Sequence, residues 1–330
     1  MRERFISVVI PCHNSETTLD ECLKAAFASE YRNYEVVVVD DASSDRSLEI
    51  MKRYPCRVIG LDEQVGVSRA RNLGVDNSRG EVILFIDSDC LLQRNSLAMV
   101  NESFEDGSEV LGGSYTPIPR DSENFFSIFQ SVFVNYHETQ GDPDYIAAHC
   151  LALEKKAFQE IGGFIEDSYI GFEAGVEDVE LSHRLRKKGY RLRMHPELLV
   201  KHIFNFTLWG SLRNAYKKSR LWTMYSLRNK DLLRSSGTAS RGLKLNVAVY
   251  FAAVVLVLAS LLAGQALLII LPGLAAMNIY YNRGLLRAFY RAKGPLFALK
   301  AAAYYFLVYP IAVGIGALMG VLEYVGKRLR

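Results

Sequence analysis

The chain has 330 residues and a formal net charge of +3, which conceals an acidic front and a basic rear. Residues 1–209 carry 22 Lys and Arg against 34 Asp and Glu, a balance of −12, whereas residues 210–330 carry 17 against 2, a balance of +15. The acidic front argues against nucleic acid as its main partner, because binding to the phosphate backbone requires the opposite charge. Five cysteines without a Cys-x-x-Cys pair indicate buried thiols in a reducing compartment.

The first 90 residues alternate between predicted strands and helices. Short apolar runs at 5–10, 36–39, 57–60 and 82–86 are typical of buried strands. Helices are predicted between them, starting near Ser15, Ser47 and Gly66. This alternation implies right-handed crossovers, so we expect an α/β fold with a doubly wound, mostly parallel sheet.

The strand predicted at 82–86 ends in two aspartates, Asp87 and Asp89. In extended backbone, side chains two residues apart point to the same side, so both carboxylates can converge beyond the end of the strand. A divalent cation would remove their mutual repulsion, and hard oxygen ligands suit Mg²⁺ or Mn²⁺. Because ligands of open α/β sheets bind at this edge, the pattern predicts a metal-held phosphate site. A helix cap before Leu91 is the alternative.

Beyond Asp89 the pattern is less regular. We expect helices at 94–104, 123–138, 155–161 and 177–188, and strands at 109–115, 145–153 and 198–201. The helix at 177–188 begins with Glu177, Asp178 and Glu180 and ends at Gly189. The three acids either complement the helix dipole or contribute to a site.

The rear of the chain has the pattern of a membrane segment. Aromatic and basic side chains alternate from Trp209 to Lys230, which predicts an interfacial helix on anionic lipid headgroups. A solvated helix that packs its tryptophans on its own domain is the alternative. Residues 247–281 contain no charged side chain. Because one span needs about 20 residues, we expect three transmembrane spans, near 246–264, 266–282 and 299–322.

The N-terminus shows no signal-peptide pattern, so we expect the front half on the cytoplasmic side of the cell membrane. Three spans place the basic segment 283–293 inside, as the positive-inside rule requires, but place Lys327, Arg328 and Arg330 outside. A single long span followed by one returning span would instead place the basic segment outside and the three basic residues of the tail inside. The membrane is therefore an expected partner whose topology the sequence leaves open.

Six motifs together resemble the inverting glycosyltransferases of family 2, which have the GT-A fold and use nucleotide-sugar donors. They are Val-Val-Ile-Pro-Cys-His-Asn (8–14), Val-Val-Asp-Asp-Ala-Ser-Ser-Asp (38–45), Gly-Val-Ser-Arg-Ala-Arg-Asn-Leu-Gly (66–74), Ile-Asp-Ser-Asp (86–89), Gly-Gly-Phe (162–164) and Glu-Asp-Val-Glu-Leu (177–181). The resemblance implies a GT-A domain over 1–205, with a Rossmann-like nucleotide-binding half and an acceptor half. Basic and aromatic interfacial helices over 206–244 and a transmembrane region over 245–330 would follow.

The resemblance also implies which residues bind the donor. They are Pro11, Asn14, Asp40, Asp41, Arg71, Asn72, Asp87 and Ser88. Asp41 would accept a hydrogen bond from the base, with Asp40 supporting the turn, and Arg71 with Asn72 would face the base and phosphates. An ordinary Asx-turn is the alternative for the Asp40–Asp41 pair, and a surface charge is the alternative for Arg71.

The remaining implied roles concern the metal and the acceptor. In this DXD-type site Asp89 would ligate Mg²⁺ or Mn²⁺ directly, Asp87 would bind through water or reach the ribose, and His202 would complete the shell. Asp178 would be the base that takes the proton of the acceptor hydroxyl in a single displacement. Glu177 and Glu180 would orient Asp178 or bind acceptor hydroxyls.

The expected function is therefore metal-assisted transfer of one sugar from a nucleotide-sugar donor to a lipid, or to a lipid-linked or envelope glycan acceptor. The chain lacks the Gln-x-x-Arg-Trp motif of processive relatives. Three alternatives remain: a polyprenyl-phosphate glycosyltransferase, a non-catalytic nucleotide-binding scaffold on the membrane, and a nucleotidyltransferase. The last usually has a Gly-rich first loop, which residues 11–14 do not provide.

Overall fold

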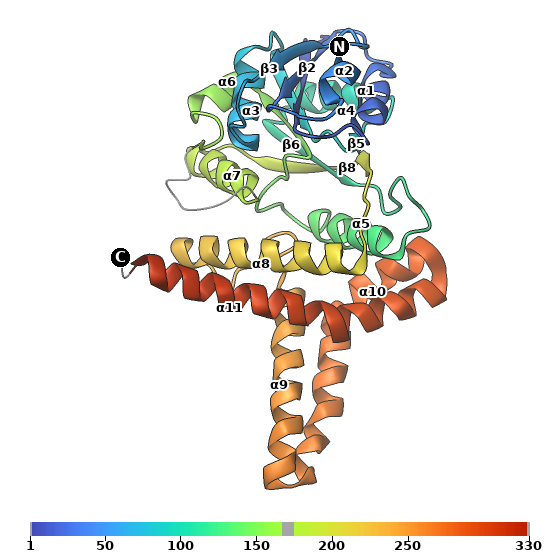
Figure 1. The fold of residues 1–330 in the computed structure, drawn as a ribbon, viewed down its shortest axis with the longest axis vertical. Coiled ribbons are helices and arrows are strands. Elements are labelled where there is room, and N and C mark those ends of the chain that lie inside the picture. Colours follow the sequence, from blue (N-terminus) through green and yellow to red (C-terminus); the bar gives the residue numbers. More distant parts are fainter. Residues whose placement is uncertain (1, 167–174, 329–330) are drawn as a thin grey trace. The chain divides into compact units, whose positions relative to one another are not determined.

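A computed structural model describes residues 2–166 and 175–328, in which the chain forms two compact units (Figure 1). Unit 1 comprises Met1–Ser122 and Glu138–Phe204, and unit 2 comprises Glu123–His137 and Asn205–Arg330. Residues 123–137, which lie inside the domain expected over 1–205, thus pack with unit 2. Arg330, one of the basic residues considered for topology, lies outside the described residues.

Unit 1 is built on a mixed sheet with the strand order β3-β2-β1-β4-β7-β6-β8-β5. Four strands form its parallel half: β1 (Ile6–Cys12), β2 (Tyr34–Asp40), β3 (Arg57–Gly60) and β4 (Val82–Ile86). β7 (Cys150–Glu154) runs antiparallel to β4 and to β6 (Val110–Tyr115). β8 (Leu192–His202) is parallel to β6 and pairs antiparallel with the short β5 (Cys90–Leu91). The predicted parallel pairing therefore holds through β4, and the direction changes at β7.

Six described helices accompany the sheet in unit 1: α1 (Leu19–Phe27), α2 (Ser47–Met51), α3 (Val67–Asp76), α4 (Ser96–Glu105), α6 (Lys155–Glu160) and α7 (Glu177–Lys188). α3 lies directly on β1 and β2 because it presents Gly74, where a Cβ would come within 2.4 Å of Val9 Cγ1. This close approach fixes the carboxyl-terminal edge of β1 and β2 next to the start of α3.

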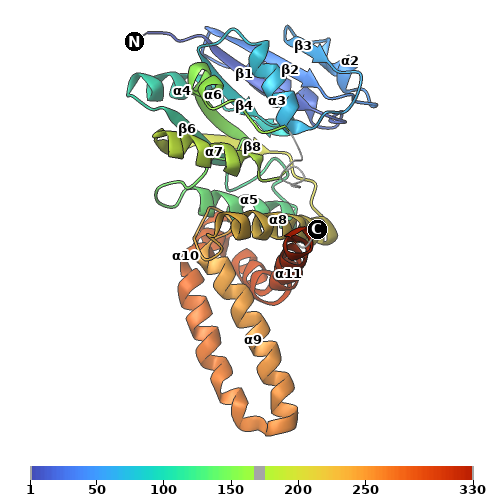
Figure 2. The ribbon, with the colours of Figure 1, turned by 90° about the vertical axis from the view of Figure 1, so that its left-hand side faces the viewer.

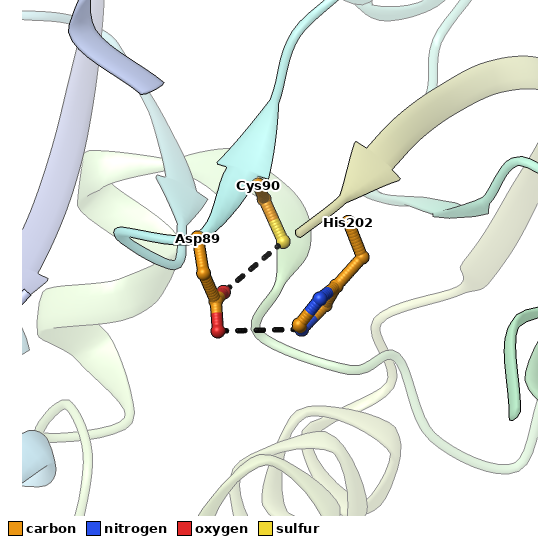
Figure 3. Close-up of side chains that lie close together, drawn as sticks. All are labelled: Asp89, Cys90 and His202. Carbon is orange, nitrogen blue, oxygen red and sulfur yellow. Dashed lines mark hydrogen bonds and ion pairs between the residues drawn. The ribbon is translucent and has the colours of Figure 1, made fainter. Parts of the chain in front are cut away.

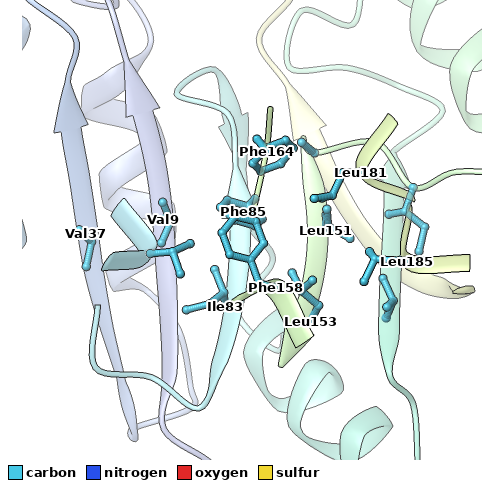
Figure 4. Close-up of a cluster of buried hydrophobic side chains, with 14 residues drawn as sticks. Val9, Val37, Ile83, Phe85, Leu151, Leu153, Phe158, Phe164, Leu181 and Leu185 are labelled. Carbon is cyan, nitrogen blue, oxygen red and sulfur yellow. The ribbon is translucent and has the colours of Figure 1, made fainter. Parts of the chain in front are cut away.

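The core of unit 1 joins the parallel half of the sheet to the elements that follow β4 (Figure 4). The Phe85 ring of β4 lies 5.5 Å from the ring of Phe158 and 5.3 Å from that of Phe164, measured between centroids. Leu181 and Leu185 of α7 are fully buried in the same cluster. This buried face holds α7 with its N-terminal acids near the end of β4.

Unit 2 consists of helices: α5 (Phe125–Glu138), α8 (Leu208–Asn229), α9 (Arg241–Ala263), η2 (Gln265–Ile269), α10 (Ile270–Ala303), η3 (Tyr304–Val308) and α11 (Tyr309–Arg328). α9 and the first part of α10 form a hairpin that projects from the layer of α8 and α11 (Figures 1 and 2). α10 breaks at Lys293 and Gly294, just before Pro295. Two segments, Arg241–Ala263 and Gln265–Arg328, are long and apolar enough to cross a membrane.

α11 lies along α8 rather than alongside the hairpin (Figure 1). Two glycines permit the contact, since a Cβ on Gly316 would meet the Tyr216 carbonyl oxygen at 2.5 Å and one on Gly320 would meet that of Arg220 at 2.5 Å. Arg220 also donates to the Glu323 carboxylate at 2.7 Å. The apolar stretch expected as a third span near 299–322 thus comprises the end of α10, η3 and most of α11.

Candidate active site

The turn that follows β2 contains a buried carboxylate, Asp41, which organises the edge of the sheet. Its two oxygens accept hydrogen bonds from the backbone N–H groups of Val65 at 2.6 Å and Gly66 at 2.9 Å. Gly66 has φ +88° and immediately precedes α3. Asp41 therefore secures the start of α3, while Asp40 accepts from the Ser43 N–H at 3.2 Å and supports the turn.

The loop after β1 is joined to this turn by polar contacts. The Asn14 Oδ1 accepts from the Ser44 N–H at 2.8 Å, and the Asn14 N–H donates to Ser43 Oγ at 3.0 Å. His13 Nδ1 lies 2.6 Å from the Asp41 carbonyl oxygen. Asn14 has φ +51°, a left-handed conformation that asparagine tolerates better than most residues. The predicted donor residues at 11–14 and 40–41 thus form one continuous polar edge.

Arg71 connects three segments that are distant in the sequence. Its guanidinium donates to Asp87 Oδ1 at 2.8 Å and to Glu177 Oε1 at 3.0 Å, and it lies 5.3 Å from the centroid of the Phe164 ring. Burial lowers the pKa of Arg71, but Asp87 and Glu177 raise it by more, so the net direction is upward. Burial likewise raises the pKa of Asp87, and Arg71 reverses that effect and lowers it. The Arg71 cation and the Asp87 carboxylate therefore stabilise each other's charged form.

Asn72, the neighbour of Arg71, has a different set of partners. Its Nδ2 donates to the Phe164 carbonyl at 2.8 Å, and its Oδ1 accepts from the Phe164 N–H at 2.9 Å. A Cβ on Gly163, which has φ +67°, would lie 2.7 Å from Asn72 Oδ1. The structure thus places Asn72 against the Gly-Gly-Phe loop, and this contact accounts for a glycine at position 163.

Asp89, Cys90 and His202 lie together where β5 pairs with β8 (Figure 3). Cys90 and His202 are opposite each other in this ladder, and His202 Nε2 lies 3.4 Å from Asp89 Oδ2. The three potential ligand atoms all lie within 4.8 Å of one another. The sequence predicted Asp89 and His202 for one metal site, and the structure brings these two residues together.

The chemistry of this cluster fits a divalent cation. Burial and the nearby Asp87 raise the pKa of Asp89 to about 7, which is the effect of two carboxylates that share one place without a neutralising ion. Burial, followed by Asp89 and Asp87, raises the pKa of Cys90 well above its ordinary value. Asp89 offers a carboxylate oxygen and His202 an imidazole nitrogen, and both are donors that a divalent cation accepts.

A wall of aromatic and ionisable side chains adjoins the cluster. The Tyr115 ring stacks on His149 at 4.0 Å and meets His202 edge-on at 4.9 Å, measured between centroids. His149 Nε2 lies 3.4 Å from Glu138 Oε2. Burial lowers the pKa of His149, but Glu138 raises it by more. No local pattern marks Glu138, because its role depends on the distant β6 and β7.

Asp178 lies at the start of α7, half-buried, and its carboxylate accepts from the Val179 N–H at 2.8 Å and the Ala148 N–H at 3.3 Å. It contributes to raising the pKa of both Arg71 and His149, so it lies within electrostatic reach of both. Its neighbour Glu177 is joined through Arg71 to Asp87. Asp178 and Asp87 thus belong to one neighbourhood.

Three other predicted residues have structural partners. Glu180 accepts a forked contact from Arg184, which also donates to the carbonyls of Ile161 and Gly163. Pro11 lies in β1 opposite Val39, and Ser88 Oγ lies 2.8 Å from Ser15 Oγ. Glu180 therefore holds Arg184 against the Gly-Gly loop, and Ser88 links the end of β4 to the first loop.

This architecture defines a class of protein. A parallel half, with Asp87 and Asp89 at its carboxyl edge, continues into a mixed half that contributes His202 and Asp178, and the whole has the GT-A fold. Residues 7–162 match the model of glycosyl transferase family 2. The chain is therefore similar to that family over residues 7–162, and the comparisons confirm the expected GT-A fold and glycosyltransferase class.

Related proteins are consistent with this assignment. The glycosyltransferase GlyA of Streptococcus pneumoniae is 28% identical over 243 residues, which cover 66% of this chain and 32% of GlyA. An undecaprenyl-phosphate 4-deoxy-4-formamido-L-arabinose transferase of Edwardsiella ictaluri is 35% identical over 118 residues, 33% of this chain and 36% of the relative. The matched regions thus span about a third of the length of both relatives.

A solved structure shares the fold of the whole chain. The mannosyltransferase PcManGT from Pyrobaculum calidifontis, in complex with GDP-Man and Mn²⁺, superimposes with a TM-score of 0.58 at 17% identity. The match covers 99% of this chain and 88% of PcManGT. At this level of identity the likeness establishes the fold, which includes helices that follow the GT-A unit.

Proposed function

We propose that unit 1 transfers one sugar from a nucleotide-sugar donor to a lipid or lipid-linked acceptor at the cell membrane. The observation that carries the proposal is the Arg71 bridge, which joins the end of β4 to the start of α7 through Asp87 and Glu177. The bridge keeps Asp87 and Asp89, the acids proposed to face the leaving group, in the same neighbourhood as Asp178, the acid proposed to act on the acceptor. The GDP-Man and Mn²⁺ of PcManGT and the lipid phosphate in the name of the arabinose transferase support the two substrate classes.

The donor would lie along the edge of the sheet that is formed by Pro11, Asn14, Asp40 and Asp41. Its diphosphate would face Asp87 and Asp89, with a Mg²⁺ or Mn²⁺ ion held by Asp89 and His202. When bound, this ion supplies positive charge that stabilises the departing diphosphate. Arg71 lies deeper and keeps the Asp87 carboxylate ionised and oriented, so it is a positioning residue.

Asp178 is the proposed base of the displacement. Hydrogen bonds from Val179 and Ala148 orient its carboxylate. The acceptor hydroxyl transfers its proton to this carboxylate as its oxygen attacks the anomeric carbon, and the bond to the diphosphate breaks on the opposite face. Such a single displacement inverts the anomeric configuration.

A polyprenyl phosphate is the alternative acceptor, favoured by the undecaprenyl-phosphate transferase among the relatives. A phosphate oxygen is already anionic, so this reaction depends less on a base. Formation of a sugar-phosphate-lipid that persists in Asp178→Asn would identify this acceptor class.

The test begins with the purified chain in detergent and a panel of UDP, GDP and dTDP, each with Mn²⁺. We expect one nucleotide to raise the melting temperature, because a ligand that binds the native state stabilises it. The corresponding labelled nucleotide sugar, given to membrane lipids, should then yield a labelled lipid product. Metal-dependent nucleotide binding without transfer to any lipid acceptor would instead indicate the non-catalytic scaffold.

A further inference from the structure

Unit 2 contains a cavity that the proposed reaction does not use. It has a volume of about 240 Å³ and is formed by α5, α8, α9, α11 and the connection between α8 and α9. Its lining is mainly apolar and includes Phe133, Trp222, Leu232, Leu243, Val247 and Val313. An apolar cavity of about 150 Å³ accommodates benzene. This larger one therefore has room for a segment of a hydrocarbon chain.

Two lysines give the cavity a basic character. Lys218 of α8 is exposed, and Lys244 of α9 is half-buried with its Nζ donating to the Arg234 carbonyl. The surrounding residues 210–244 carry nine Lys and Arg against one Asp. Basic side chains that flank apolar surface attract anionic lipid headgroups. Charge complementarity thus selects an occupant with a phosphate.

The cavity is accessible from a surface suited to lipid. Leu233, which lines it, is 84% exposed, and α9 continues from the cavity into apolar side chains that are also exposed, with Leu261 at 78% and Leu262 at 93%. Such a row is typical of a helix surrounded by hydrocarbon. The mouth of the cavity therefore lies where acyl chains and headgroups would meet.

We propose that this cavity binds one anionic phospholipid of the surrounding bilayer. An acyl chain would occupy the apolar lining, and the phosphate would contact Lys218 and Lys244. Phosphatidylglycerol has both features. The site is separate from sugar transfer, so its absence would leave the proposed function intact.

Two tryptophans make the site measurable, because the chain contains Trp209 and Trp222 and no others. Trp222 lines the cavity, whereas Trp209 is 77% exposed and lies outside the lining. Trp209→Phe leaves Trp222 as the sole fluorophore, and Trp222→Phe is the matched control. Each is placed in phosphatidylcholine nanodiscs with a minor fraction of either brominated phosphatidylglycerol or brominated phosphatidylcholine. We expect Trp222, and not Trp209, to be quenched more strongly by the brominated phosphatidylglycerol.

Two neighbouring lysines on α8, Lys217 and Lys218, provide the specificity control. In the Trp209→Phe background, Lys218→Glu should abolish the excess quenching, and Lys217→Glu, at the neighbouring exposed lysine outside the lining, should preserve it. Equal quenching by the two brominated lipids, or equal loss in both lysine variants, would overturn the proposal. Relief of quenching by added polyprenyl phosphate, but not by the same amount of unlabelled phosphatidylglycerol, would also overturn it in favour of an acceptor lipid.

Discussion

Arg71 is the residue on which the geometry of unit 1 most depends, because its side chain is 4% exposed and holds two acids. Arg71→Gln leaves Asp87 and Glu177 without their cation in a partly desolvated place, and breaking a buried pair in this way destabilises by about 3–5 kcal/mol. For a unit of this size each kcal/mol shifts the melting temperature by about 2–4 °C. We therefore expect a drop of several degrees in thermal unfolding, together with loss of transfer.

A matched control is available two residues away on the same helix. Arg69 is 54% exposed at its side chain and lies 3.9 Å from Glu166. A solvent-exposed pair of this kind contributes about 0–1 kcal/mol, so Arg69→Gln should scarcely change the melting temperature. Similar melting temperatures for the two variants would show that the Arg71 bridge is not what holds α7 to the end of β4.

Removing one predicted metal ligand tests the cluster at β5 and β8. Asp89→Ala takes away its carboxylate, so we expect Mn²⁺-dependent binding of the nucleotide to weaken by more than about tenfold, at least as much as loss of an outer-shell partner does. Isothermal calorimetry with and without Mn²⁺ measures the difference. Asp76→Ala, at an exposed acid at the end of α3, is the control and should leave the affinity unchanged. Unchanged affinity in Asp89→Ala would remove Asp89 from the metal site.

Replacing the proposed base, Asp178, should have a distinct kinetic effect. Asp178→Asn keeps the size of the side chain but cannot accept the proton, so turnover to a hydroxyl acceptor should fall by about 10²–10⁴-fold with donor binding retained. Glu180→Gln is the comparison, because Glu180 is held by Arg184 and should affect melting temperature more than turnover. Wild-type turnover on a hydroxyl acceptor in Asp178→Asn would exclude the role.

The site residues that the sequence predicted are those with a local signature. Asp87 and Asp89 stand two apart at the end of an apolar run, and that spacing alone places them at the sheet edge. The contact of Arg71 with Glu177 joins residues 106 apart, and the pairing of Cys90 with His202 depends on the β5–β8 register. Such contacts are set by tertiary packing, which is why neither the bridge nor the aromatic wall could be predicted.

Among the elements, the contact between α8 and α11 depends on small residues. A Cβ on Gly320 would meet the Arg220 carbonyl oxygen at 2.5 Å and Thr223 Cβ at 3.0 Å, so Gly320→Ala should force the helices apart. Overpacking of this kind typically costs about 1–3 kcal/mol. We expect a lower melting temperature in detergent and weaker disulfide cross-linking between cysteines introduced on α8 and α11.

The same substitution elsewhere on α11 should have the opposite sign. Gly326 has no atom within 4 Å of an added Cβ. Alanine is more favourable than glycine in a helix by about 0.8–1 kcal/mol, so Gly326→Ala should leave the melting temperature unchanged or raise it. Equal destabilisation by both variants would show that close packing of α8 on α11 at Gly320 is not the cause of the effect.

Most predicted elements lie within a few residues of their expected bounds, including several without a strong apolar run. The run at 82–86 corresponds to β4 itself, and 177–188 to α7. β8 was expected at 198–201 but extends over Leu192–His202, because its first half is rich in charged residues and is held by pairing with β6. Period and composition describe a strand only where one face is continuously buried.

At the scale of the whole molecule, the arrangement of the helices in unit 2 indicates a membrane topology that could not be predicted from the apolar runs in the sequence. If the α9–α10 hairpin crosses the membrane twice and α8 and α11 lie in the interface, the basic segment 283–293 and Lys327 with Arg328 are all on the cytoplasmic side. This satisfies the positive-inside rule, which three spans or one long span with a return do not. We therefore propose two spans and an interfacial α11.

Cysteine labelling distinguishes the two topologies. Leu262→Cys, at the exposed tip of the hairpin, should react with a membrane-impermeant maleimide from the outside of intact cells, whereas Lys327→Cys should react in inside-out vesicles. Arg283→Cys should react on the same side as Lys327→Cys. Labelling of Lys327→Cys from the outside would contradict the interfacial α11 and support three spans.

The surplus of carboxylates in unit 1 has a kinetic consequence. Asp87, Glu177 and Asp178 are gathered around the Arg71 guanidinium, and Asp89 lies close to Asp87, so a bare nucleotide anion would be repelled as it approached. The donor should therefore bind productively as its complex with the metal ion. The order in which metal and nucleotide are added then affects the rate. Preincubation with Mn²⁺ should shorten the lag before the first turnover, while excess chelator should slow capture of the donor more than the later steps.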